Sequence, residues 1–179
     1  MDTKYNVVGV IKSQICAAIV NSEDVRKALD FNGSNYKDYD PDDPFTLIHN
    51  CVIPWYQHPE IITTTEPLIF VGVSLVQHGP NSSLISTSVN ILCSVDKDDM
   101  KTTSGYFRQD LLEIGCICYT RVDWIADEVI KAISSLQGTW IGDIELIKSG
   151  EYAMNSTRYC REMVLNLYDV NIGKLLQNG

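Results

Sequence analysis

Residues 120–138 (TRVDWIADEVIKAISSLQG) carry the most regular hydrophobic pattern of the chain. Apolar residues recur three or four positions apart, at 122, 125, 126, 129, 132, 133 and 136, which is the spacing of one helical face. Thr120 is placed to cap the first turn, Asp123 suits the exposed N–H groups there, and Gly138 follows as a left-handed stop. We therefore predict a helix over 121–137. Its apolar face is too wide to remain in water, so it must pack on other elements.

Alternating segments on both sides of this helix predict two antiparallel hairpins. Residues 68–76 and 84–95 alternate and are separated by a Gly-Pro-Asn-Ser turn, which predicts the first hairpin over 68–95. Residues 143–170 predict the second. On the first strand we expect Ile69, Val71, Val73 and Leu75 to share one face, with Gly72 and Ser74 on the other. On the second strand we expect Ile91, Cys93 and Val95 to face inward, and Asn90 and Ser94 to face outward.

The N-terminal part predicts two helices within residues 5–30, followed by a polar, acidic loop at 31–44. Residues 45–55 form a short apolar stretch that is either a strand or a tucked segment, and residues 173–179 are expected to fray. The prediction is one domain over 1–179 of the α+β class. It has an antiparallel sheet of about four strands, with helices packed on one face.

Composition narrows the classes of function. The net charge of -9 argues against a protein that grips nucleic acid, because phosphate binding requires a basic surface. The first residues lack the features of a signal peptide, and Lys12, Ser13 and Gln14 interrupt the apolar run at 7–20, so we expect neither secretion nor a membrane span. The six cysteines are then expected to be free thiols rather than disulfides.

The sequence contains no clear catalytic or metal-binding pattern. Cys116 and Cys118 are the closest cysteine pair and have no second pair to balance them, and the acidic loop lacks the Gly and Glu of a calcium-binding loop. No nucleophile elbow or phosphate-binding loop is present. We therefore predict no catalytic residue, metal or cofactor, and no enzyme activity, although a cysteine and a histidine distant in sequence can still meet in space.

Five residues are candidates for a partner interface. Trp55 and Tyr56 follow a proline and Trp140 lies in a predicted turn, so none belongs to a simple core face. Tyr39 and Asp40 lie in the acidic loop. Half-exposed Trp and Tyr are enriched at protein interfaces, and ordinary packing outside the main core is an equally good interpretation of the tryptophans.

Several features follow one another along residues 7–170. They are the N-terminal helix pair, the loop NYKDYDPDDP, Ile53-Pro54-Trp55, the hairpin LIFVGVSLV/VNILCSVDKDD ending in Asp98-Asp99, an Arg-x-Asp before the long helix (Arg121-Val122-Asp123, with Arg108-Gln109-Asp110 as the other candidate), and the last strand REMVLNLYDVN. In this order they resemble the tail terminator or neck proteins of long-tailed bacteriophages and their prophage relatives. Residues 100–119 depart from the family pattern because they exceed its usual link between hairpin and helix, and we interpret them as an insertion.

The resemblance implies a structural protein of the virion, assembled in the host cytoplasm. Such proteins form hexameric rings that cap the tail tube, stop its growth and join tail to head, and they have no active site. The implied partners are further copies of the chain, the tail tube protein and a head-completion or connector protein. DNA would pass through the ring without sequence-specific binding, and an acidic lining would let it slide.

Two other interpretations remain open at this point. The chain could be a head-completion or connector protein, which binds on the portal side of the neck. It could also be an unrelated cytosolic α+β binding domain or enzyme, which would require a concave pocket with converging polar groups.

Overall fold

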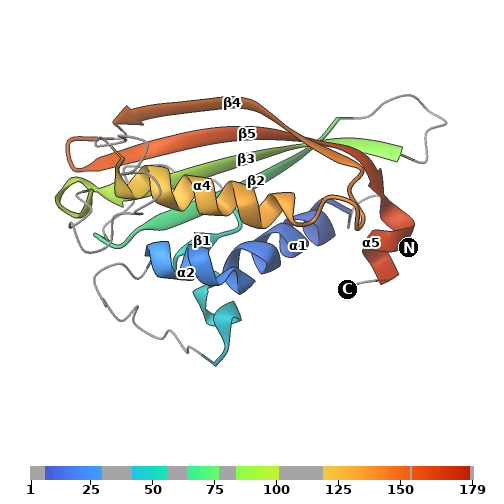
Figure 1. Ribbon diagram of the computed structural model, residues 1–179, viewed down its shortest axis with the longest axis horizontal. Coiled ribbons are helices and arrows are strands. Elements are labelled where there is room, and N and C mark those ends of the chain that lie inside the picture. Colours follow the sequence, from blue (N-terminus) through green and yellow to red (C-terminus); the bar gives the residue numbers. More distant parts are fainter. Residues whose placement is uncertain are drawn as a thin grey trace, which may run out of the picture.

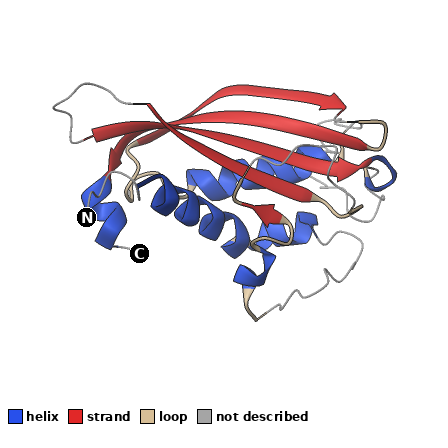
Figure 2. Ribbon diagram, turned by 180° about the vertical axis from the view of Figure 1, so that it is seen from behind, coloured by secondary structure: helices blue, strands red, loops and turns tan. Residues whose placement is uncertain are grey.

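A computed structural model describes residues 7–29, 42–55, 64–76, 84–100, 119–153 and 155–177. They form an α+β fold in which one five-stranded sheet is covered on one face by helices (Figures 1 and 2). The strands are β1 (Val52–Ile53), β2 (Leu68–Val76), β3 (Leu84–Asp96), β4 (Asp143–Ala153) and β5 (Arg158–Asn171), in the spatial order β1-β2-β3-β5-β4. Both predicted hairpins and the predicted fold class are confirmed.

The sheet is mixed, whereas the sequence predicted an antiparallel one. β2, β3, β5 and β4 pair antiparallel, but β1 pairs parallel to β2 through Val52–Ile69 and Ile53–Phe70. The chain reaches β1 from a 3-10 helix, η2 (Pro44–Leu47), through a turn in which His49 has a φ of 73°. A two-residue strand is too short to show an alternating pattern, and therefore sequence periodicity could not reveal it.

The predicted helices are present. α1 spans Val7–Asn21, α2 spans Glu23–Leu29 and α4 spans Arg121–Ser134. Thr120 caps α4 in a capping box with Asp123, and Gly138 has the expected positive φ, of 80°. The prediction of a frayed end over 173–179 was wrong for residues 173–177. They belong to a helix, α5 (Ile172–Gln177), whose Leu175 is buried and whose Lys174 N–H donates to the side chain of Asn171.

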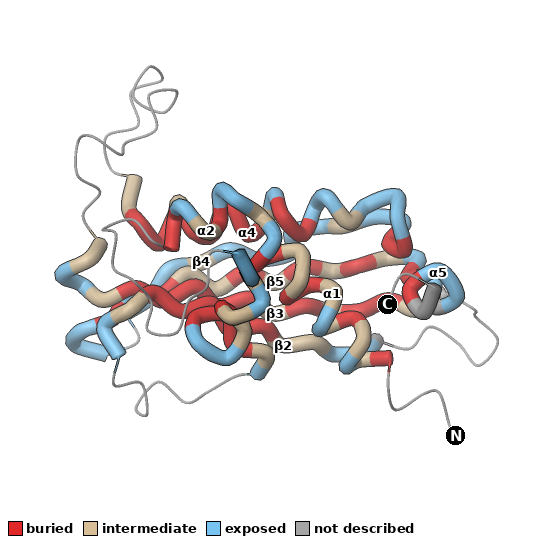
Figure 3. The backbone as a smooth tube through the Cα atoms, turned by 90° about the horizontal axis from the view of Figure 1, so that it is seen from below, coloured by how far each residue is buried: buried red, intermediate tan, exposed pale blue. Residues whose placement is uncertain are grey.

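The core lies between the sheet and the helices. Figure 3 shows buried residues alternating with exposed ones along the helices, as expected when one helical face packs on a sheet. The faces predicted from alternation on the first hairpin agree with burial, and Ile69, Val71, Ile91, Cys93 and Val95 are buried. Leu75 shares the face of Ile69 and Val71, as predicted, but is 36% exposed near the end of its strand. On β5, Met163, Leu165 and Leu167 are also buried.

The face of the sheet away from the helices is not uniformly exposed to solvent. Ser94 was expected to be exposed, but it is fully buried, as are Phe70 and Leu92 on the same face. The reason is Arg158, whose guanidinium donates to the Ser94 hydroxyl and to the main-chain oxygens of Thr64 and Glu66. These contacts draw the segment before β2 over that end of the sheet.

Most of the acidic loop 31–44 and of the insertion 100–119 lies outside the described residues. Within the described part of the chain, no helix has both the length and the apolar character needed to cross a bilayer.

Candidate interaction surface

Among the strands that the structure describes, β4 lies at the edge of the sheet along its whole length of 11 residues (Figure 1). None of its residues is buried, and three large apolar side chains are exposed: Leu146 by 45%, Ile147 by 50% and Tyr152 by 42%. A long edge strand presents unpaired N–H and C=O groups that can pair with another chain, and most monomers protect such an edge with short length, charge or proline. β4 contains no proline and places two adjacent apolar residues near its middle, between charged residues at 143, 145, 148 and 151.

A bulge lies at the centre of this edge. The pairing of β4 with β5 shifts between Leu146 and Lys148, which leaves Ile147 as the extra residue. Lys148 could guard the edge by its charge, but its ammonium is turned back across the sheet and lies 2.7 Å from Glu162 of β5. The residue that the bulge adds at the edge is therefore apolar.

Side chains order β4, whose outer side pairs with no strand of the described residues. The Tyr168 hydroxyl donates to Glu145 at 2.9 Å, and the Gln137 amide donates to Asp143 at 2.9 Å. The strand is thus held against β5, and a partner that pairs with it would meet an edge already in strand conformation.

An ion cluster fixes the start of α4 to the second hairpin. Arg161 of β5 donates to the Asp123 carboxylate, and Glu151 of β4 lies 3.7 Å from the same guanidinium nitrogen. Burial alone would raise the pKa of Asp123, but hydrogen bonds from Thr120 and Arg161 outweigh it and hold that pKa below its ordinary value. The negative charge of Asp123, and a hydrogen bond with it, raise the pKa of Glu151.

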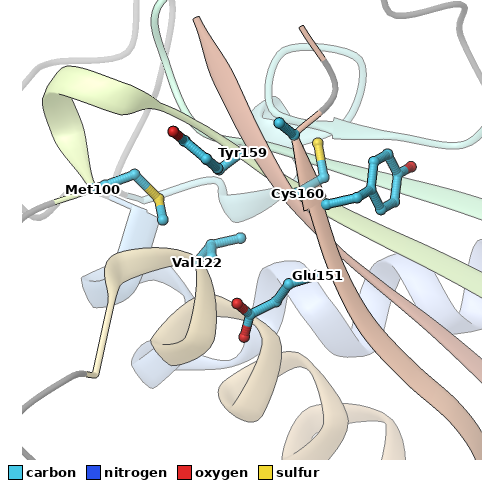
Figure 4. A pocket seen from close by; sticks show the side chains of 7 residues that line it. Met100, Val122, Glu151, Tyr159 and Cys160 are labelled. Carbon is cyan, nitrogen blue, oxygen red and sulfur yellow. The ribbon is translucent and has the colours of Figure 1, made fainter. Parts of the chain in front are cut away.

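A shallow pocket of about 230 Å³ lies beside this cluster (Figure 4). It is lined by Met100, Val122, Glu151, Tyr152, Ala153, Tyr159 and Cys160. Its polar groups are one carboxylate, two phenols and a thiol, and burial raises the pKa of the Cys160 thiol. A thiol of raised pKa is a poor nucleophile at neutral pH, so the pocket offers little chemistry.

The other described thiols also have raised pKa values. Burial raises the pKa of Cys16 to about 11 and that of Cys51 to about 12, and it also raises the pKa of Cys93. Cys116 and Cys118 lie outside the described residues. In the segments that the structure describes, no three His, Cys, Asp or Glu side chains gather closely enough to hold a metal ion.

The tryptophans predicted for an interface have different environments. Trp55 is 46% exposed and stacks on His49, with ring centroids 5.3 Å apart. Trp140 is only 2% exposed, which agrees with ordinary packing, the other interpretation of this residue. Its turn is pinned to β5 because the Trp140 carbonyl accepts from Asn171 N–H and Gly142 N–H donates to Tyr168. Tyr39, Asp40 and Tyr56 lie outside the described residues.

Two buried arginines were missed as structural residues. Arg121, fully buried, donates to the carbonyls of Ala28 and Leu29 at the end of α2. Arg158, 1% exposed, binds Ser94 and the segment before β2. No pattern in the sequence indicates either role, because arginines at the start of a helix and of a strand usually face solvent.

The comparison with family models now places the chain. The model of the YomW family matches residues 22–167, which include β1 to β4, most of β5 and α4. The chain belongs to the YomW family. That name is of a phage type and agrees with the bacteriophage part of the resemblance, but it states no position in the virion. No curated protein matches the chain.

Proposed function

We propose that this YomW-family protein is a structural component of the phage neck, a tail terminator whose copies form a hexameric ring. The observation that carries the proposal is β4, an edge strand of 11 residues, none of them buried, with Leu146 and Ile147 exposed at its bulge. Such an edge is a liability in a protein that works alone, but it is suited to a protein that works as an assembly. Phage-type family membership and the α+β fold support the same role.

In this role the ring caps the tail tube and contacts a head-completion or connector protein, and no residue acts as a catalyst. Duplex DNA passes through the ring without sequence-specific contact. The net charge of -9 supports this, because an acidic lining repels phosphate and lets the duplex slide. The partly exposed Trp55, stacked on His49, is the described aromatic side chain best placed for contact with another virion protein.

Native mass spectrometry tests the proposal directly. The purified chain is measured alone and with a tail tube protein, and the expected species is a hexamer of about 121 kDa, six times 20.1 kDa. A ring that forms only with the tube also supports the terminator, since assembly can depend on a template. A twelvefold species would move the protein to the connector position. A strict monomer that ignores both tube and portal would overturn the neck assignment in favour of a small binding domain.

A further inference from the structure

The described strands leave a second free edge on the opposite side of the sheet. β1 covers only Ile69 and Phe70 of β2, so residues 71–76 have no partner strand on that side within the described chain. Ser74 and Leu75 of this stretch are exposed. Each copy therefore presents two edges that could pair with a neighbour: β4 on one side and residues 71–76 on the other.

The directions of these two edges are compatible with side-by-side assembly. β2, β3, β5 and β4 are antiparallel to one another in sequence across the sheet, so β4 and β2 run in opposite directions. When two copies stand side by side in the same orientation, β4 of one meets β2 of the next as an antiparallel pair. The neighbouring copy then continues the alternation already present within each sheet.

The chemistry of the two edges also matches. Residues 71–76 (VGVSLV) carry no charge, and Leu75 is 36% exposed. They would meet a β4 edge whose middle presents Leu146 and Ile147. Two copies of net charge -9 repel each other, so an uncharged edge is the surface at which copies can approach with the least electrostatic cost.

We infer that the subunit contact is this pairing of β4 with residues 71–76 of β2 in the next copy. The inference rests on the proposed ring and identifies its interface. The contact is head to tail, so every copy uses both edges and the chain of contacts closes on itself when the rotation per copy is 60°, the angle of a six-membered ring. A pairing of β4 with β4 would instead close after two copies and leave both β2 edges free.

Edge substitutions test the interface under conditions in which the wild type forms its ring. Ile147→Glu and Leu75→Glu each place a carboxylate on one of the two proposed edges, and each should abolish the hexamer in native mass spectrometry. Phe45→Glu is the matched control, because Phe45 is as exposed as Ile147, at 50%, and lies on η2 away from both edges. It should leave the hexamer unchanged. Hexamers at wild-type abundance in both edge variants would overturn the inference.

Cross-linking identifies the partner edge without a destabilising charge. Ser74 and Lys148 lie on the sheet face opposite the helices, one on each proposed edge. Ser74→Cys and Lys148→Cys proteins are treated with a short bismaleimide, separately and mixed, with wild type as the control for native thiols. A 74–148 link that appears only in the mixture is expected. A 148–148 link in the single variant would show a twofold β4 contact instead and would overturn the inference.

Different results would contradict the proposed interface and the proposed function. A hexamer that survives both edge variants and gives no 74–148 link leaves the terminator proposal standing and removes only this interface. A protein that never forms a ring, with or without a tube, removes the proposed function and the interface with it.

Discussion

Arg121 and Arg158 join elements that the hydrogen bonds within helices and between strands do not connect. A guanidinium offers five N–H donors in a fixed fork. Arg121 donates to carbonyl oxygens at the end of α2, and Arg158 donates to carbonyl oxygens just before β2. Arg121 joins the end of α2 to the start of α4, and Arg158 joins the segment before β2 to the start of β5. Both therefore stabilise contacts between parts of the chain that are about ninety residues apart.

Removing Arg158 should be among the costliest single changes. Arg158→Ala leaves the carbonyls of Thr64, Glu66 and Ser94 without their donor and opens a void. We expect a loss of about 3 kcal/mol or more in the free energy of unfolding, measured by urea denaturation. Lys97→Ala, at an exposed lysine, is the control and should change stability by less than about 0.5 kcal/mol. An equal effect of the two changes would contradict this role.

The Asp123 cluster predicts a dependence of stability on pH. The folded-state pKa of Asp123 is lowered, so its carboxylate contributes stability above the pKa of the unfolded chain, and that contribution is lost as pH falls through the folded-state pKa. Asp123→Asn should therefore cost about 1–3 kcal/mol at pH 7. The difference from wild type should shrink below about pH 4, as measured by urea denaturation at several pH values.

Glu151→Gln should change the stability at pH 7 in the opposite direction to Asp123→Asn. The folded-state pKa of Glu151 is raised by the charge of Asp123, so its ionised form costs stability above that pKa, and protonation relieves the cost. The variant should be at least as stable as wild type at pH 7, and its advantage should vanish in acid. A larger loss for Glu151→Gln than for Asp123→Asn at pH 7 would contradict the assignment.

At the scale of elements, α4 shows where sequence patterns are sufficient. Its cap, its buried face and the left-handed residue after it were all predicted, because each depends on neighbours within a few positions. Gly138 has a φ of 80° and open space around its missing Cβ. Gly138→Ala should cost about 1 kcal/mol from backbone strain alone, measured by thermal unfolding. Gly150→Ala, equally uncrowded but without a positive φ, should be close to neutral.

Features set by distant contacts were not predictable in the same way. The parallel β1 depends on a two-residue match with β2, and the burial of Ser94 depends on Arg158, which lies 64 positions further along the chain. The burial of Trp140 depends on a turn that is fixed by hydrogen bonds to β5. The exposed β4 edge was hidden for a related reason: alternation identifies a strand but does not show which strand lies at the edge of the sheet.

At the scale of the whole molecule, the net charge opposes assembly of the copies, whereas the exposed strand edges favour it. Every copy carries a net charge of -9, so assembly must overcome a repulsion that grows with each subunit added to a ring. The proposed contact pairs an uncharged β2 stretch with the apolar middle of β4, so its attraction depends little on salt, whereas the repulsion is screened by it. The balance between attraction at the edge contact and repulsion between the charged copies should therefore change with ionic strength.

Salt should strengthen the ring. Raising sodium chloride from about 20 mM to about 300 mM shortens the Debye length from about 20 Å to about 6 Å, so the hexamer fraction measured by analytical ultracentrifugation should rise. Glu145→Gln removes one negative charge from β4 and keeps an acceptor for Tyr168, so it should assemble at lower salt than wild type. Subunits joined mainly by ion pairs would separate as salt rises, and that result would rule out the apolar edge contact.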